Sequence, residues 1–167
     1  MQNSPASDDV PLWKRIVFGR RPGRTLWRAA VLALVALLVF KFVLIPVRIS
    51  GESMQPTYRD RQVNCINRLA YLRQRPRRGD VVAVAFTGPH IMLFKRIVGL
   101  PGETVAIERG IVLINGQPLD EPYVKERAPW QLSPRRMDPD EYFFIGDNRG
   151  MRQPWHTYGS ANADRIL

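Results

Sequence analysis

The chain has very few of the residues that bind metals. Cys65 is the only cysteine among 167 residues, which excludes an intrachain disulfide and any cysteine-rich metal site. The two histidines, His90 and His156, have no metal-ligating residue at a useful spacing. The sequence therefore predicts no metal and no cofactor. Cys65 itself lies in a strand-like stretch, where we expect a small, partly buried side chain.

Acidic residues are also scarce. The chain has 15 Asp and Glu against 25 Lys and Arg, and the excess is uneven: residues 1–28 carry six basic and two acidic residues, whereas the chain from Arg48 onward carries 18 and 13. A nucleic-acid-binding protein usually gathers its charge on one face or helix. The arginine cluster at 73–78 contains Pro76 and precedes Gly79, which predicts a loop. We therefore expect no nucleic acid partner and favour anionic lipid headgroups.

One long apolar run interrupts this charged sequence. Residues 29–40 contain no polar side-chain atom, and after Lys41 the apolar run resumes as far as Val47. Residues 29–47 are therefore close to the roughly 20 residues that a membrane-crossing helix needs. By the positive-inside rule, the basic residues before this run predict a cytoplasmic tail at 1–28, a transmembrane anchor at 29–47 and an extracytoplasmic domain at 48–167.

A cleavable signal peptide is the competing interpretation, because its basic start and short apolar core look similar. Such a peptide ends in a site of small residues, whereas the apolar run here is followed by the bulky Val47, Arg48 and Ile49. The sequence favours an uncleaved anchor. It predicts a single-pass protein of the cell (plasma or inner) membrane, with the lipid bilayer as one partner.

Residues 48–167 have the pattern of a mainly β domain. Short apolar runs alternate with turns rich in glycine and proline, which is typical of strands. A short helix near 63–72 and a long surface excursion at 121–140 are also predicted, and Asn115-Gly116 is typical of a hairpin turn. The predicted strands are 62–67, 80–86, 91–98, 104–108, 111–114 and 141–145.

Ser53 is a candidate nucleophile because it lies in a Gly-x-Ser turn just beyond the apolar run. A serine hydroxyl is a poor nucleophile until a base removes its proton. Neither histidine has an aspartate pairing or a nucleophile-elbow motif beside it.

Lys95 is the alternative base. It lies in the apolar stretch 91–99, and strand alternation places it on one face with Leu93 and Ile97, while Arg96 points the other way. A lysine in apolar surroundings can remain neutral and accept a proton. On these residues alone, an edge-strand lysine that reaches solvent remains open as an alternative.

Three blocks occur in order behind the apolar run. They are Ser-Gly-Glu-Ser-Met-Gln-Pro-Thr at 50–57, Lys-Arg-Ile-Val-Gly-Leu-Pro-Gly at 95–102 and Gly-Asp-Asn-Arg at 146–149. Together they resemble the type I (leader or signal) peptidase family, over about residues 29 to 160. The resemblance implies a signal-peptidase-like β-sheet or barrel catalytic domain behind one N-terminal transmembrane helix.

The resemblance also implies a function. Ser53 would be the nucleophile and Lys95 the general base of a Ser-Lys dyad, in a membrane-bound serine endopeptidase that cleaves N-terminal signal peptides from exported preproteins. The backbone N–H of Ser53 would form part of the oxyanion hole. Some members have a serine where this chain has Gly51, so the second donor is unidentified.

The implied substrate segment would add as a strand beside residues 47–51 and the strand that leads to Lys95. The candidate walls of its shallow pockets also fit ordinary core packing, which stays open as the alternative. These candidates are Ile49, Met54, Leu93 and Phe94.

The third block departs from the family pattern. Arg152 replaces a serine that lies near the lysine amine in the family, Pro154 replaces an aspartate and His156 an arginine. An arginine at 152 would either lower the pKa of Lys95 by repulsion or point away, and His156 is a candidate substitute polar contact. The family usually continues through one more strand beyond residue 167.

These departures leave a second function open. The chain could be a non-catalytic or weakly active relative that binds membrane-proximal peptides, although such a module has no need of both Ser53 and Lys95. An autoproteolytic repressor domain of the SOS-response type uses a similar dyad. The apolar run and the lack of a DNA-binding helix pair argue against it.

Overall fold

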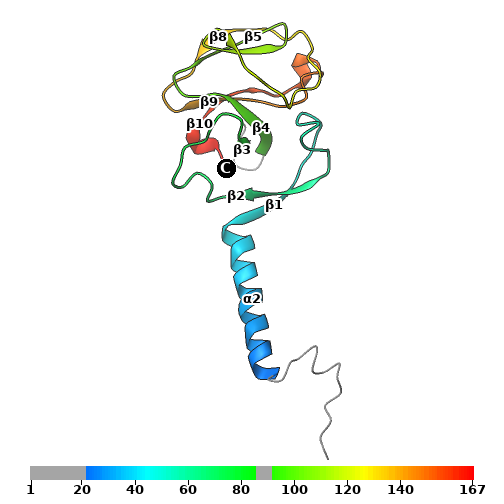
Figure 1. Ribbon diagram of the computed structural model, residues 1–167, viewed down its shortest axis with the longest axis vertical. Coiled ribbons are helices and arrows are strands. Elements are labelled where there is room, and N and C mark those ends of the chain that lie inside the picture. The colour runs from blue at the N-terminus through cyan, green and yellow to red at the C-terminus, as the bar shows by residue number, and fades with distance from the viewer. Residues whose placement is uncertain (1–21, 86–91) are drawn as a thin grey trace, which may run out of the picture. The chain divides into compact units, whose positions relative to one another are not determined.

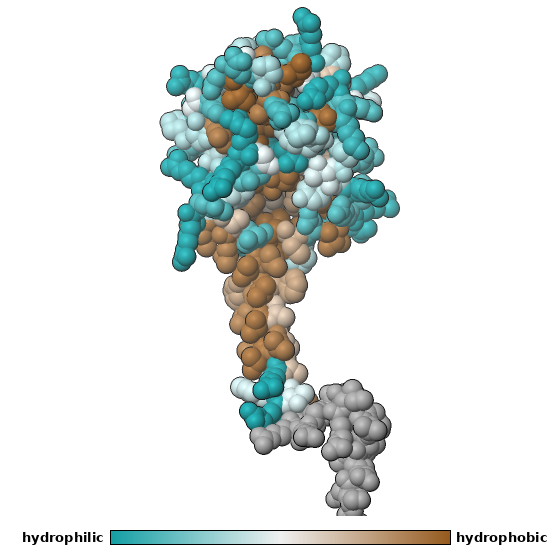
Figure 2. Space-filling view, viewed as in Figure 1, coloured by the Kyte–Doolittle hydropathy of each residue, from teal (hydrophilic) through white to brown (hydrophobic). Residues whose placement is uncertain are grey.

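The computed structural model describes residues 22–85 and 92–167. The chain divides into two units, Met1–Phe42 and Val43–Leu167. In the first unit, α2 (Pro22–Phe42) is a helix of 21 residues, and its large apolar side chains, such as Leu32 and Leu37, are exposed. Figure 2 shows this apolar surface along the helix. By length and composition, Gly23–Phe42 is able to cross a membrane.

The helical part of the apolar run differs from the predicted 29–47. The helix begins at Pro22 and ends at Phe42, and the last part of the run forms strand β1 (Leu44–Arg48). Proline suits a first helical turn but disrupts a helix interior, so Pro22 fits the start whereas Pro46 opposes continuation. The β-branched Ile45 and Val47 favour a strand instead. The extent of the membrane anchor stays a prediction.

The unit Val43–Leu167 is built from three antiparallel sheets (Figure 1). The strand orders are β1-β2, β10-β9-β4-β3 and β7-β6-β5-β8. The strands after β1 are β2 (Val63–Asn67), β3 (Val81–Ala85), β4 (Met92–Gly99), β5 (Thr104–Glu108), β6 (Ile111–Ile114), β7 (Gln117–Pro118), β8 (Leu132–Arg136), β9 (Glu141–Ile145) and β10 (Gly159–Asn162).

The prediction of a mainly β domain is confirmed. All six predicted strands are present, and β5, β6 and β9 have the predicted bounds. The predicted hairpin turn between β6 and β7 is also present, since Asn115 and Gly116 both have positive φ angles, of 50° and 80°.

Three other predictions were wrong. Residues 63–72 contain no helix, because the first five form β2 and pair with β1. Residues 121–140 are not only a surface excursion, since β8 pairs with β5 and both Trp130 and Met137 are buried. Cys65 is exposed, because its neighbour Ile66 takes the inward position of the alternating strand.

Two apolar clusters form the core and share strands β4 and β9. Val98, Phe143 and Ile145 belong to one cluster, whereas Ile97 and Phe144 belong to the other. Both faces of the central sheet are therefore covered, and all five residues of β9 are buried. Strand β4, which carries Lys95, therefore packs against an apolar cluster on each of its two faces.

Candidate active site

Ser53 lies in a turn that local contacts hold in shape. Gly51 has a φ of 102°, which glycine adopts without strain, and its N–H donates to Asp60 Oδ1 over 2.8 Å. The Gln55 N–H donates to the Glu52 carbonyl over 3.0 Å, and the Met54 side chain is 2% exposed. These contacts fix the backbone on both sides of the candidate nucleophile.

Lys95 reaches Ser53 from strand β4. Its side chain is 2% exposed, and its Nζ lies 2.6 Å from Ser53 Oγ. The two residues that sequence reasoning singled out, 42 positions apart, are therefore brought into hydrogen-bond contact. Arg96 points to the other side of the strand as predicted, where it contacts Asp147.

The surroundings of Lys95 favour the neutral amine. Burial lowers its pKa from 10.5 to about 8, and the negative charge of Asp147 opposes this shift in part. A charged amine loses its hydration in such a place, so the neutral form becomes accessible near physiological pH. A neutral amine within 2.6 Å of a hydroxyl has the geometry to take its proton.

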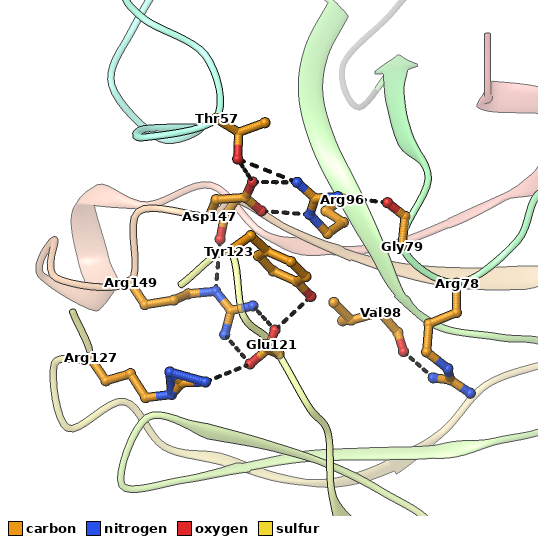
Figure 3. Close-up of polar contacts among 11 residues, drawn as sticks. Thr57, Arg78, Gly79, Arg96, Val98, Glu121, Tyr123, Arg127, Asp147 and Arg149 are labelled. Atoms are coloured by element: carbon orange, nitrogen blue, oxygen red, sulfur yellow. Dashed lines mark hydrogen bonds and ion pairs between the residues drawn. The ribbon is translucent and has the colours of Figure 1, made fainter. Parts of the chain in front are cut away.

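Asp147 ties the nucleophile turn to strand β4 (Figure 3). It is fully buried and accepts two hydrogen bonds from Arg96, over 2.8 and 2.6 Å. Thr57 also donates to Asp147, and Arg96 donates to the Gly79 carbonyl over 2.7 Å. A bidentate arginine–carboxylate pair fixes orientation as well as distance, so the turn after Ser53 is anchored to the strand that carries Lys95.

The loop 146–149 supports Ser53 from the other side. The Asn148 N–H donates to the Ser53 carbonyl over 3.0 Å, and Asn148 Nδ2 donates to the Glu52 carbonyl over 3.1 Å. Gly146 must be glycine here, because a Cβ would lie 2.2 Å from the Ser53 carbonyl oxygen. Sequence reasoning identified this loop only through its resemblance to a known block.

A buried ion pair holds that loop in place (Figure 3). Arg149 is 1% exposed; it donates to the Gly146 carbonyl over 2.7 Å and pairs with Glu121. The Tyr123 hydroxyl donates to Glu121 over 3.1 Å, and the Tyr123 ring lies 3.9 Å from the Arg96 guanidinium. Glu121 and Tyr123 were not predicted, since nothing in their local sequence indicates a partner far along the chain.

A cavity of about 530 Å³ lies beside Ser53. The four predicted pocket residues all contribute to its lining. Ile49 and Met54 are also buried in the core, at 4% and 2% exposure, whereas Leu93 and Phe94 on β4 are half-buried. Ile49 and Met54 therefore pack in the core and line the cavity at the same time.

The three residues of the third block that depart from the family pattern lie in different environments. Arg152 is exposed and lies 5.3 Å from the Trp155 ring, and it is not among the groups that shift the pKa of Lys95. Pro154 lies within the short 3-10 helix Gln153–Trp155. His156, in contrast, is buried at 3% exposure. His90 lies outside the described residues.

Residues able to bind a metal ion are scattered over the part of the chain that the structure describes. Among residues 22–85 and 92–167, no three His, Cys, Asp or Glu side chains are grouped closely enough to hold a metal ion. A buried lysine amine in contact with a serine hydroxyl, beside a cavity, is the arrangement expected of a hydrolase of the Ser-Lys class.

Comparison with known proteins identifies the family. Residues 23–152 match the family model described as signal peptidase, peptidase S26. A signal peptidase I of Leptolyngbya laminosa is 34% identical over 141 residues, 80% of this chain and 70% of that protein. The signal peptidase I S of Bacillus subtilis (strain 168) is 35% identical over 134 residues, 73% of this chain and 72% of that protein.

The chain therefore belongs to the signal peptidase family, peptidase S26, and is a membrane-associated serine peptidase. A solved signal peptidase I from Enterococcus faecalis V583 is 24% identical and gives a TM-score of 0.43, covering 56% of this chain and 94% of that one.

Proposed function

We propose that Ser53 and Lys95 are the catalytic pair with which this peptidase cleaves signal peptides from exported preproteins. The observation that carries the proposal is the 2.6 Å contact between Lys95 Nζ and Ser53 Oγ, inside an apolar setting that lowers the pKa of the lysine. Membership of the signal peptidase family supports the substrate class.

The chemistry follows from this contact. Lys95 takes the Ser53 hydroxyl proton as Oγ attacks the scissile carbonyl carbon, and then gives that proton to the departing amine. The ester that remains on Ser53 is hydrolysed by a water, whose proton passes to the same lysine and from it to the departing Ser53 Oγ, which restores the hydroxyl. Ser53 contributes its own backbone N–H to the oxyanion that forms in both halves of the reaction.

Two strand edges border the cavity, and they suit an extended peptide. Strand β4 pairs with β9 only from Arg96 onward, so that, among the described residues, Met92–Phe94 have a strand on one side only. Strand β1 likewise pairs with β2 alone. A substrate that adds as a strand would use the free backbone groups of both edges and place alternate side chains in the cavity.

The membrane arrangement is the third part of the proposal. The basic residues at 1–28, including those in the first turns of α2, lie on the cytoplasmic side; the helix crosses the cell membrane from there, and the unit Val43–Leu167 lies outside the cytoplasm. The density of Lys and Arg before the helix supports this orientation.

Incubation of the detergent-solubilised full chain with a preprotein tests the proposal, beside Ser53→Ala and Lys95→Ala. Cleavage by the unchanged chain alone is expected. No cleavage of any of several preproteins, with peptide binding retained, would favour the non-catalytic alternative. Cleavage that survives in both variants would remove Ser53 and Lys95 from the chemistry.

A further inference from the structure

His156 is a buried ionisable side chain that has no role in the mechanism proposed above. His156 is 3% exposed, and neither of its ring nitrogens makes a hydrogen bond within the described part of the chain. A buried polar atom without a partner costs free energy, and it is rare enough to need an explanation. The edge-on Trp130 ring, at 4.8 Å, explains the packing of the imidazole but not its nitrogens.

The imidazole lies against the backbone of the nucleophile. A Cβ on Gly146 would lie 2.2 Å from the Ser53 carbonyl oxygen and 2.5 Å from His156 Nε2. Both atoms therefore border the same small space, which the absence of a side chain at Gly146 leaves open. The Ser53 carbonyl already accepts the Asn148 N–H, and a carbonyl oxygen has room for a second donor.

The charges around the ring keep it neutral. Burial, together with the positive charges of Lys95 on β4 and Arg149 in the loop after β9, lowers the pKa of His156 to about 4, although the carbonyls of Ser53 and Thr157 oppose this shift in part. A neutral imidazole carries one N–H donor and one acceptor. Its donor is therefore available to the Ser53 carbonyl.

We propose that His156 is a positioning residue for Ser53. Its neutral ring directs Nε2–H to the Ser53 carbonyl oxygen as substrate binds, and this second donor beside Asn148 fixes the peptide plane that carries the nucleophile. Catalytic hydrogen bonds are often long in a free enzyme and tighten only in the reacting complex, which fits the absence of a bond of normal geometry here. The inference rests on the proposed function of Ser53.

Steady-state kinetics on the full chain tests the role through a matched set of variants. His156→Phe keeps a flat ring against Trp130 but has no donor, whereas His156→Gln keeps an N–H donor. We expect His156→Phe to lower kcat by roughly 10- to 100-fold with KM little changed, and His156→Gln to recover much of the loss. The pH at which activity rises should be the same in both variants as in the unchanged chain, because the ring is neutral throughout that range.

Three results would overturn the inference. Unchanged kcat in His156→Phe would make the residue a packing element only, and a displaced pH profile would make it a proton carrier. A lower thermal midpoint with full activity at low temperature would assign it to stability. These outcomes differ from failure of the proposed function, in which the unchanged chain itself does not cleave or Ser53→Ala remains active.

Nuclear magnetic resonance gives a readout that needs no turnover. The chain has only two histidines, so His156→Phe assigns the imidazole signals. We expect the Nε2–H tautomer from pH 6 to 9 and a pKa far below 6.5, which rises in Lys95→Met because the charge of Lys95 lowers it. An Nδ1–H tautomer would contradict the proposed contact.

Discussion

Burial of the Lys95 amine makes this residue reactive at the expense of stability. At pH 7 the amine is below its folded pKa of about 8 and is held charged among apolar side chains. Replacement by Met removes that charge and nearly conserves the volume. Lys95→Met is expected to abolish cleavage, by at least about 1,000-fold, and to raise the free energy of unfolding by about 2–3 kcal/mol.

Denaturant titration and a preprotein cleavage assay check both halves of this prediction. Lys125→Met, at an exposed site, is the matched control and should change neither quantity greatly. A Lys95→Met variant that is less stable than the unchanged chain would show that the amine contributes to folding rather than opposing it.

The pH dependence of cleavage should follow the same amine. Because the neutral form acts as the base, kcat/KM is expected to rise as pH increases through about 8 and to level above it. Initial rates from pH 6 to 10 measure the curve. A rise centred near 6.5 would point to a histidine base instead.

His156 makes stability depend on pH in the acid range. Its folded pKa of about 4 lies below the unfolded value of 6.5, so the unfolded chain takes up the proton first as pH falls. The stabilisation is complete above pH 6.5 and is lost toward pH 4, by about 3 kcal/mol. Unfolding measured at pH 7 and 4.5 should show a smaller decline for His156→Phe, and an equal decline would contradict the assignment.

At the level of elements, the loop 146–149 connects both halves of the dyad. Asp147 is fully buried beside Arg96, which is 11% exposed. Asp147→Asn leaves the guanidinium without its counter-charge, which should cost about 3–5 kcal/mol of stability. It also removes the charge that raises the pKa of Lys95, so the rise in kcat/KM should move to lower pH.

Thermal unfolding and the pH profile of the surviving fold measure the two effects. Asp164→Asn, at an exposed site, is the control for the loss of a negative charge. It should change neither the temperature of unfolding nor the pH profile. If the profile of Asp147→Asn moved to higher pH, the electrostatic link between Asp147 and Lys95 would be refuted.

The strands that were predicted correctly can be identified from their own local sequence. Strands β5 and β6 are apolar runs bounded by glycine turns, so local pattern defines them. Strands β1 and β8 depend on partners instead: β1 continues an apolar run that looks helical until Pro46, and β8 has polar, exposed residues that pair with β5. Strand β10, with its sequence Gly-Ser-Ala-Asn, has no apolar pattern to identify it.

The residues of the site likewise fall into those that local sequence identifies and those that only distant contacts identify. Ser53 and Lys95 stand in motifs that the sequence shows, and the apolar neighbours of Lys95 already indicate a neutral amine. The contact between Thr57 and Asp147 spans 90 positions, and no periodicity predicts which distant carboxylate a threonine meets. The pairing of Glu121 with Arg149 is equally non-local, so only the folded chain identifies the supports of the dyad.

At the scale of the whole molecule, the scarcity of cysteine provides a direct test of orientation. Cys65 is the only cysteine and is exposed, so a membrane-impermeant maleimide needs no engineered site. In intact spheroplasts, Cys65 should react if the catalytic unit lies outside the cytoplasm. A Cys65→Ser chain with Ser4→Cys in its basic tail is the control, and it should react only after the membrane is permeabilised. The opposite pattern would place the dyad on the cytoplasmic side, where translocated preproteins do not arrive, and the proposed substrate would have to be abandoned.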